Sequence, residues 1–93
     1  MTKRVRIRTK ANAADIRYRL LVRQIAMELG LKGYCRMNED HQMEIEVEGR
    51  DQSVEEFLRF FHQERSHDNK SESISIEIFD DLKGYKKMDT DLA

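Results

Sequence analysis

Apolar and charged residues alternate strictly in two stretches of the chain, and this alternation constrains the fold more than any other feature. Residues 4–10, RVRIRTK, place Val5 and Ile7 on one face of an extended chain and the basic residues on the other. Residues 43–48, MEIEVE, alternate three apolar residues with three glutamates. Because successive side chains of a β-strand point to opposite faces, both stretches are predicted to be strands with one buried face.

Changes in the apolar period predict the other elements. Between about residues 15 and 29 the apolar residues recur at helical spacing, and Gly30 is a natural helix stop. The same reasoning predicts a second helix at 52–63 and further strands at 33–37 and 74–78.

This order of elements predicts an α+β fold. Each strand has one apolar face, so the economical arrangement is the ferredoxin-like βαββαβ sandwich, a four-stranded antiparallel sheet with two helices on one face. In that topology the first strand lies between the third and the fourth. Residues 1–80 are predicted to form this domain, and residues 81–93 a polar C-terminal tail or an edge extension. The predicted core consists of Val5, Ile7, Leu21, Ile25, Met43, Ile45, Val47, Phe57, Leu58, Phe61, Ile74 and Ile76.

Composition narrows the class of protein. A chain of 93 residues fits one domain with one small core. The 17 Lys and Arg residues nearly cancel the 18 Asp and Glu residues, so there is no general attraction to nucleic acid or acidic lipid. The single cysteine, Cys35, fits a reducing compartment. Because the sequence has neither a signal peptide nor an apolar run of membrane-spanning length, a cytoplasmic protein without membrane contact is expected.

The outward faces of the central strands disfavour a nucleic-acid-binding sheet. Basic residues of the first strand are expected to lie against acidic residues of the third, namely Arg4, Arg6 and Arg8 against Glu44, Glu46 and Glu48. RNA-binding sheets of this shape place aromatic residues at such positions, where bases stack on them. The charged residues are therefore interpreted as a solvated ladder of ion pairs.

Two further stretches carry a family resemblance. ELGLKGY (residues 28–34) combines a helix end with a following glycine and aromatic residue, and MEIEVEG (residues 43–49) gives the next strand. Together with the strand register from Val5 to about Phe61, they resemble the acylphosphatases. This family hydrolyses carboxylic–phosphoric anhydrides without a metal. The resemblance implies the same fold, a small anion or acyl phosphate as ligand, and no metal or cofactor.

The signature loop of that family, G-x-V-Q-G-V-x-F-R, falls on residues 11–19. The resemblance places Arg19 where the family holds phosphate, whereas Ala11 and Asp15 replace both glycines. Alanine resists the positive φ angles of a tight glycine loop, and the Asp15 carboxylate opposes a phosphate. The stretch is therefore interpreted as an ordinary strand-to-helix connection with Asp15 as helix cap. The candidate anion-binding loop consists of Ala13, Ala14, Asp15, Ile16, Arg17 and Tyr18.

The second signature of the family, G-W-V-R-N, falls on residues 33–37, GYCRM. The resemblance therefore places Met37 where the family has the asparagine that positions the attacking water. A thioether cannot orient a water as an amide does. Asn38 follows one residue later, on the opposite face of a strand, and replaces the asparagine only if a bulge or the turn swings it back. Arg19 and Asn38 are thus the candidate catalytic residues.

Other reactive groups are interpreted as structural. Cys35 is expected to be a buried core thiol, because no histidine is adjacent to it in sequence. The histidines share no metal-ligand spacing, so no metal site is predicted. Arg17, Arg19 and Arg23 are interpreted as solvated helix charges, with Arg19 as the alternative holder of a small anion or an acidic partner.

Three functions of different class follow. The first is an acylphosphatase-like domain, catalytically impaired or inactive, that acts through contacts with an unknown protein or through weak anion binding. The second is an active acylphosphatase with Arg19 holding the phosphate. The third is a nucleic-acid-binding sheet. Loss of the asparagine and of both glycines favours the first over the second, and the lack of outward aromatic residues on the central strands disfavours the third.

Overall fold

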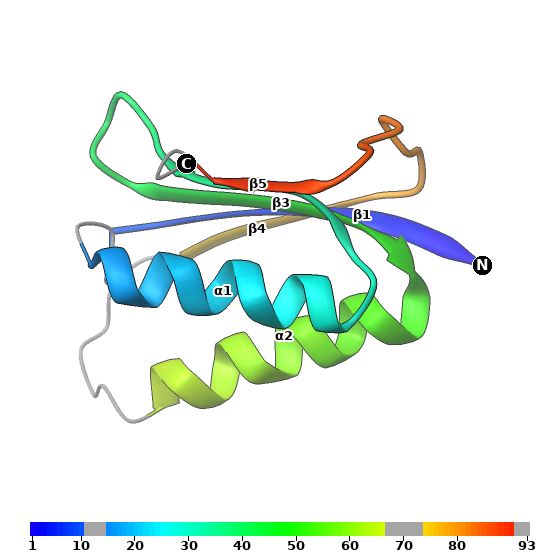
Figure 1. The fold of residues 1–93 in the computed structure, drawn as a ribbon, viewed down its shortest axis with the longest axis horizontal. Helices are drawn as coiled ribbons and strands as arrows, with labels where there is room; N and C mark the ends of the chain where they lie inside the picture. Colours follow the sequence, from blue (N-terminus) through cyan, green and yellow to red (C-terminus); the bar gives the residue numbers. More distant parts are fainter. Residues whose placement is uncertain (11–14, 67–73, 91–93) are drawn as a thin grey trace.

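A computed structural model describes residues 1–10, 15–66 and 74–90. Both helices lie on the same face of one sheet (Figure 1). The elements are β1 (Thr2–Thr9), α1 (Ile16–Glu28), β2 (Lys32–Met37), β3 (Met43–Arg50), α2 (Asp51–Ser66), β4 (Ile74–Phe79) and β5 (Met88–Thr90). The predicted helices correspond to α1 and α2, and α2 continues beyond its predicted end.

The strand order across the sheet is β4-β1-β3-β2-β5. All neighbouring strands are antiparallel except β2 and β5, which are parallel. The ferredoxin-like α+β sandwich is therefore confirmed, including the first strand between the third and the fourth. The sheet has one strand more than predicted, because residues 88–90 pair with the outer edge of β2. A segment this short contains no alternation that could have indicated a strand.

Short local signals define both ends of α1. At its start the Asp15 carboxylate accepts a hydrogen bond from the backbone N–H of Tyr18 at 3.2 Å, which confirms the predicted cap. At its end Gly30 has a φ of 73°, and the Leu31 N–H donates to the Ala26 carbonyl at 2.9 Å. This C-terminal motif needs a residue that tolerates positive φ, so the predicted stop at Gly30 is confirmed.

The core lies between the sheet and the two helices. Predicted core residues that are buried are Val5, Ile7, Met43, Ile45, Val47, Phe57 and Phe61. Predicted core residues that are only partly buried and pack against its margin are Ile25, Leu58, Ile74 and Ile76. The prediction for Leu21 is wrong, since this side chain is 41% exposed. It lies about 100° around the helix from Val22, which takes the buried position. Cys35 is buried, as predicted.

Gly33 allows β2 to approach β3 closely. A Cβ atom at this position would lie 1.8 Å from the carbonyl oxygen of Glu46, so no side chain fits. On its other side the Gly33 N–H donates to the Lys87 carbonyl at 3.0 Å, just before β5 begins. This glycine therefore supports strand pairing at both edges of β2.

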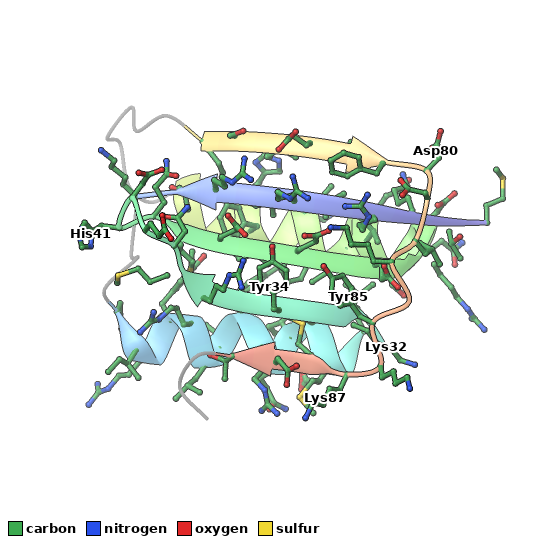
Figure 2. All side chains as sticks on the ribbon, turned by 90° about the horizontal axis from the view of Figure 1, so that it is seen from above. Lys32, Tyr34, His41, Asp80, Tyr85 and Lys87 are labelled. Carbon is green, nitrogen blue, oxygen red and sulfur yellow. The ribbon has the colours of Figure 1, made fainter. Side chains whose placement is uncertain are left out.

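Residues 80–87, here called the crossing segment, run from β4 at one edge of the sheet to β5 at the other (Figure 2). Side chains of the central strands, above all Arg4 and Glu48, hold this segment. Arg4 donates to the carbonyl and to the carboxylate of Asp81, both at 3.1 Å. The Glu48 carboxylate accepts from the backbone N–H groups of Lys83, Gly84 and Tyr85 at 2.7, 2.9 and 3.1 Å.

Candidate functional site

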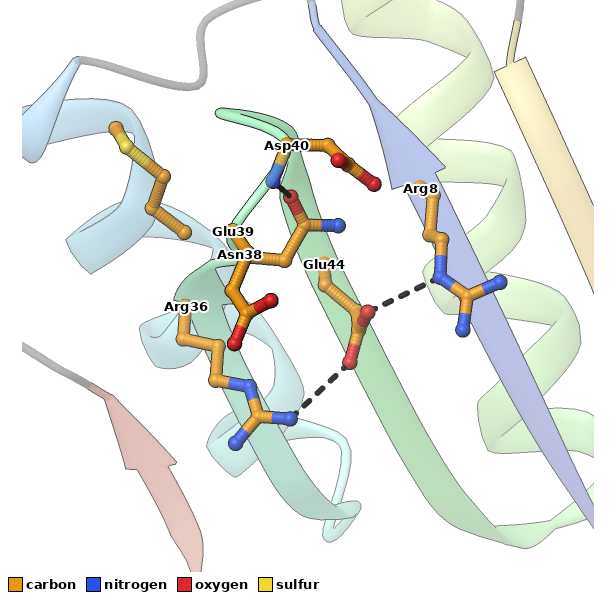
Figure 3. Close-up of a pocket in the computed structure, with 7 residues that line it drawn as sticks. Arg8, Arg36, Asn38, Glu39, Asp40 and Glu44 are labelled. Carbon is orange, nitrogen blue, oxygen red and sulfur yellow. Dashed lines mark hydrogen bonds and ion pairs between the residues drawn. The ribbon is translucent and has the colours of Figure 1, made fainter.

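An open pocket of about 530 Å³ lies at the end of β2, where the second signature of the resemblance falls (Figure 3). Arg8 and Arg36 flank Glu44 and donate to its carboxylate at 3.0 and 3.4 Å. The pocket is lined by Arg8, Arg36, Met37, Asn38, Glu39, Asp40 and Glu44. Its three acidic side chains outnumber its two arginines, so its net charge does not attract a phosphate.

Met37 ends β2 and is paired in register with Met43 of β3. Its side chain is partly buried and packs against the hydrophobic core. The position that the resemblance assigns to the family's asparagine therefore carries an apolar side chain, which packs against the core. A thioether is at most a weak hydrogen-bond acceptor and donates nothing.

The Asn38 amide belongs to the turn between β2 and β3. Its oxygen accepts from the backbone N–H groups of Asp40 and Gln42 at 2.9 and 3.0 Å. Its nitrogen donates to the side-chain oxygen of Gln42 at 3.2 Å. The turn also places His41 at a φ of 60°, unusual for a residue other than glycine. Both ends of the Asn38 amide are thus engaged in holding this turn.

The start of α1 carries the other candidate residues. Ala13 and Ala14 lie outside the described residues, whereas Asp15, Ile16 and Arg17 are exposed at the helix start.

Tyr18 and Arg19 are buried, Arg19 with 6% of its surface exposed. The interpretation as a solvated charge therefore holds for Arg17 and is wrong for Arg19, which faces inward together with Val22 and Ala26. Arg23 is half-buried, and its Nε donates to the Met88 carbonyl at 3.1 Å.

The outward face of β1 and β3 holds the predicted charge ladder, and its register places Arg4 opposite Glu48, Arg6 opposite Glu46 and Arg8 opposite Glu44. The prediction that the ladder is solvated is wrong for Arg4 and the three glutamates, which are buried, whereas Arg6 and Arg8 are partly exposed. Glu46 is only 1% exposed and accepts from Arg4 and, at 3.4 Å, from Arg6. The Arg4 guanidinium lies 4.0 Å from the centre of the Phe79 ring. Burial follows because this ring and the crossing segment lie over the charged side chains.

Tyr34 joins this network from β2. Its hydroxyl lies 2.6 Å from the Glu44 carboxylate and 3.0 Å from that of Glu46. Because the hydroxyl has a single proton, it donates a hydrogen bond to only one of these carboxylates at a time. Its ring lies under the Arg36 guanidinium at 4.5 Å and meets the Tyr85 ring edge-on at 6.0 Å. Tyr34 was not among the predicted site residues, although its alternation with Cys35 in the predicted strand puts it on the outward face.

The network fixes the ionisation of its members. Burial by itself raises the pKa of Glu44, but hydrogen bonds from Tyr34 and Arg8 outweigh burial and lower this pKa to about 2. For Glu46, burial is likewise outweighed by hydrogen bonds from Arg4 and Tyr34, and its pKa is lowered. Burial and hydrogen bonding to Glu44 raise the pKa of Tyr34. None of these three groups is therefore close to exchanging a proton at neutral pH.

Neither a metal site nor a membrane-spanning helix is present among the described residues. In the part of the chain that the structure describes, no three His, Cys, Asp or Glu residues are grouped so that they could hold a metal ion. None of the described helices is both long and apolar enough to cross a membrane.

Fold and sequence together define the class of protein. Two helices pack on one face of a mainly antiparallel sheet in which the first strand lies between the third and the fourth, as in the ferredoxin-like α+β folds. Residues 7–89 match the model of the acylphosphatase family, so the chain belongs to this family. The resemblance inferred from residues 28–34 and 43–49 is therefore confirmed.

Solved structures with the same fold include single-domain and larger proteins. An acylphosphatase from Bacillus subtilis is 19% identical with a TM-score of 0.74, covering 95% of this chain and 97% of that one. An acylphosphatase from Coxiella burnetii is 16% identical with a TM-score of 0.68, covering 96% and 92%. Full-length HypF, in a phosphate- and nucleotide-bound form, is 23% identical with a TM-score of 0.61, covering 97% of this chain and 12% of HypF. No curated protein sequence matches the chain. At these identities the similarities show the fold.

Proposed function

We propose that the chain is an acylphosphatase-like domain with impaired or lost catalysis, which acts through protein contacts or weak anion binding. One observation carries this proposal. The position of the water-orienting asparagine holds Met37, packed against the core, and the amide of the neighbouring Asn38 is engaged within its own turn. Neither side chain is available to aim a water at an acyl phosphate.

The pocket beside these residues supports weak rather than tight anion binding. Its arginines, Arg8 and Arg36, already donate to Glu44, and Glu39 and Asp40 add negative charge at its margin. At the start of α1, the exposed Asp15 carboxylate caps the helix. It already accepts a hydrogen bond from the Tyr18 N–H in the first turn, where an anion would otherwise bind.

The second candidate function is hydrolysis of acyl phosphates with Arg19 as the phosphate-binding residue. Membership of the family and the position of Arg19 in the first signature favour it. In this alternative Asn38 leaves its turn contacts when substrate binds and takes over the role of the missing asparagine.

Hydrolysis of a small acyl phosphate such as acetyl phosphate separates the two candidates. We expect little turnover by the unmodified protein and a gain in the variant Ala11→Gly/Asp15→Gly/Met37→Asn. One positioned hydrogen-bonding group in such a site is worth about 10²–10³ in rate. Met37→Asn alone measures the contribution of the amide without altering the loop.

Two controls keep the test specific. Asn38→Asp preserves the oxygen that accepts from the turn N–H groups but removes the amide N–H donors. Arg19→Lys preserves the charge of this buried side chain but not its two-pronged geometry. Brisk turnover by the unmodified protein, lost in Arg19→Lys with folding intact by circular dichroism, would establish the second candidate in place of the first.

The cellular location and the kind of partner are further proposals. A cytoplasmic location is supported by Cys35, a buried free thiol that suits a reducing compartment. Nucleic acid is disfavoured as a partner because the outward positions of β1 and β3 hold paired arginines and glutamates instead of stacking residues. No cofactor is proposed.

A further inference from the structure

The outer side of α1 carries an unusual share of the exposed apolar surface. Seven large apolar side chains are exposed in the described part of the chain, and four of them belong to α1. These are Ile16 (53% exposed), Leu20 (45%), Leu21 (41%) and Met27 (48%). A single exposed apolar residue is ordinary, but several on one helix mark an interaction surface.

These residues form two neighbouring ridges along the helix. At about 100° per residue, Ile16, Leu20 and Met27 fall along one ridge. Leu21 falls along the next, and this second ridge contains Arg17, Leu21, Gln24 and Glu28, all exposed. The two ridges together are called here the outer face of α1. They point away from the sheet, because the opposite side of the helix contributes the buried residues.

The charged residues at the two ends of this face lie at positions that are unfavourable with respect to the helix dipole. Arg17 lies in the first turn of α1, near its positive end, and Glu28 ends the helix, near its negative end. The first turn has no acidic residue and the last turn no basic one. By contrast, α2 begins with Asp51. Neither Arg17 nor Glu28 forms an ion pair with any residue in the described ranges. A neighbouring helix of opposite direction would satisfy both charges.

We propose that the outer face of α1 binds the same face of a second copy of this chain, with the two helices antiparallel. In a twofold arrangement centred between residues 22 and 23, Arg17 lies opposite Glu28 of the second copy, and Leu21 lies opposite Gln24. The pairing occurs twice by symmetry. The ridge of Ile16, Leu20 and Met27 flanks these contacts and is removed from water. Antiparallel packing also brings the positive end of each helix near the negative end of the other.

The size of the surface sets the strength of the dimer. An α-helix of 13 residues is about 20 Å long. One helix face is smaller than the roughly 800 Å² per partner of a standard stable interface. The dimer is therefore weak, with a dissociation constant of the order of 10–100 µM. This inference does not rest on the proposed catalytic state.

Sedimentation velocity of the protein over about 10 µM to 1 mM tests the dimer. Arg17→Glu or Glu28→Arg places two like-charge pairs in the interface, and each should weaken association about three- to tenfold. Both changes also put a favourable charge at a helix end, so thermal stability of the monomer should not fall. The double variant Arg17→Glu/Glu28→Arg should regain dimerisation. This recovery cannot arise from misfolding.

Apolar variants locate the surface. Leu20→Lys should raise the dissociation constant at least about tenfold by burying a charge at the interface. Ile78→Lys is the matched control, since Ile78 is 59% exposed on β4, away from α1, and should leave association unchanged. A monomer at about 1 mM overturns the proposal and leaves the face to a different protein. Association that survives both single charge variants, fails to return in the double variant, or is lost with Ile78→Lys also overturns it.

Discussion

The buried carboxylate of Glu44 makes stability depend on pH in a window that the structure defines. Glu44 is 7% exposed and accepts hydrogen bonds from Tyr34 at 2.6 Å and Arg8 at 3.0 Å. Its pKa falls from 4.5 to about 2 because these hydrogen bonds outweigh burial. A group whose pKa is lower in the folded protein stabilises it above the unfolded pKa, and this contribution is lost as the pH falls through the folded pKa. The expected contribution is about 3 kcal/mol, present above pH 4.5 and lost on acidification toward pH 2.

Urea unfolding of the unmodified protein and of Glu44→Gln between about pH 7 and pH 2 measures this contribution. Glutamine has nearly the shape of the protonated side chain, so the two proteins should differ by about 3 kcal/mol at neutral pH and converge near pH 2. Glu77→Gln is the control, because Glu77 is half-exposed and lies 3.4 Å from Arg8, and its removal should cost less than about 1 kcal/mol. A difference between Glu44→Gln and the unmodified protein that stays constant over the whole pH range would refute the reasoning.

Three more predictions concern packing and the crossing segment. Phe57→Ala or Phe61→Ala should cost about 3–5 kcal/mol in urea unfolding, since both rings are fully buried; less than about 1 kcal/mol at both would mean that α2 does not cover the sheet as described. Gly33→Ala should cost about 3 kcal/mol or more in the same assay, because its Cβ meets the Glu46 carbonyl; a stable variant would contradict the close strand approach. Glu48→Gln should speed amide hydrogen exchange at Lys83, Gly84 and Tyr85, and unchanged protection there would show that the Glu48 carboxylate does not hold the segment.

Periodicity predicted the parts of the fold that local sequence determines. The alternation in residues 4–10 and 43–48 predicted which faces of β1 and β3 are buried, and Gly30 and Asp15 predicted the helix ends. The burial of the outward glutamates could not be predicted in this way. It depends on Phe79, which follows the predicted strand 74–78, and on the crossing segment, which lies far along the chain and has no apolar period of its own.

The candidate site was only partly predictable for a similar reason. Resemblance located Arg19 and Met37, and alternation predicted that Asn38 faces away from its neighbour. Which atoms the Asn38 amide contacts depends on the path of the turn, including the positive φ of His41, and no local sequence pattern specified that path. The burial of Arg19 likewise depends on the packing of α1 over β2 and β5, and for β5 the sequence left open whether these residues form a tail or an edge extension.

The placement of β1 between β4 and β3 in the sheet has a consequence for biosynthesis. This strand precedes the other strands of the domain, but one of its two partners is β4, and the Arg4 side chain binds Asp81, 77 residues later in the chain. Contacts between such distant segments form slowly, because long loops must close before any pairing energy is gained. During synthesis, the apolar face of β1 therefore remains incompletely paired until the segment around residue 81 has left the ribosome. Folding of this domain is therefore expected to finish only when the segment around residue 81 is free to pair, and chaperones that protect exposed strands would act on its N-terminal half.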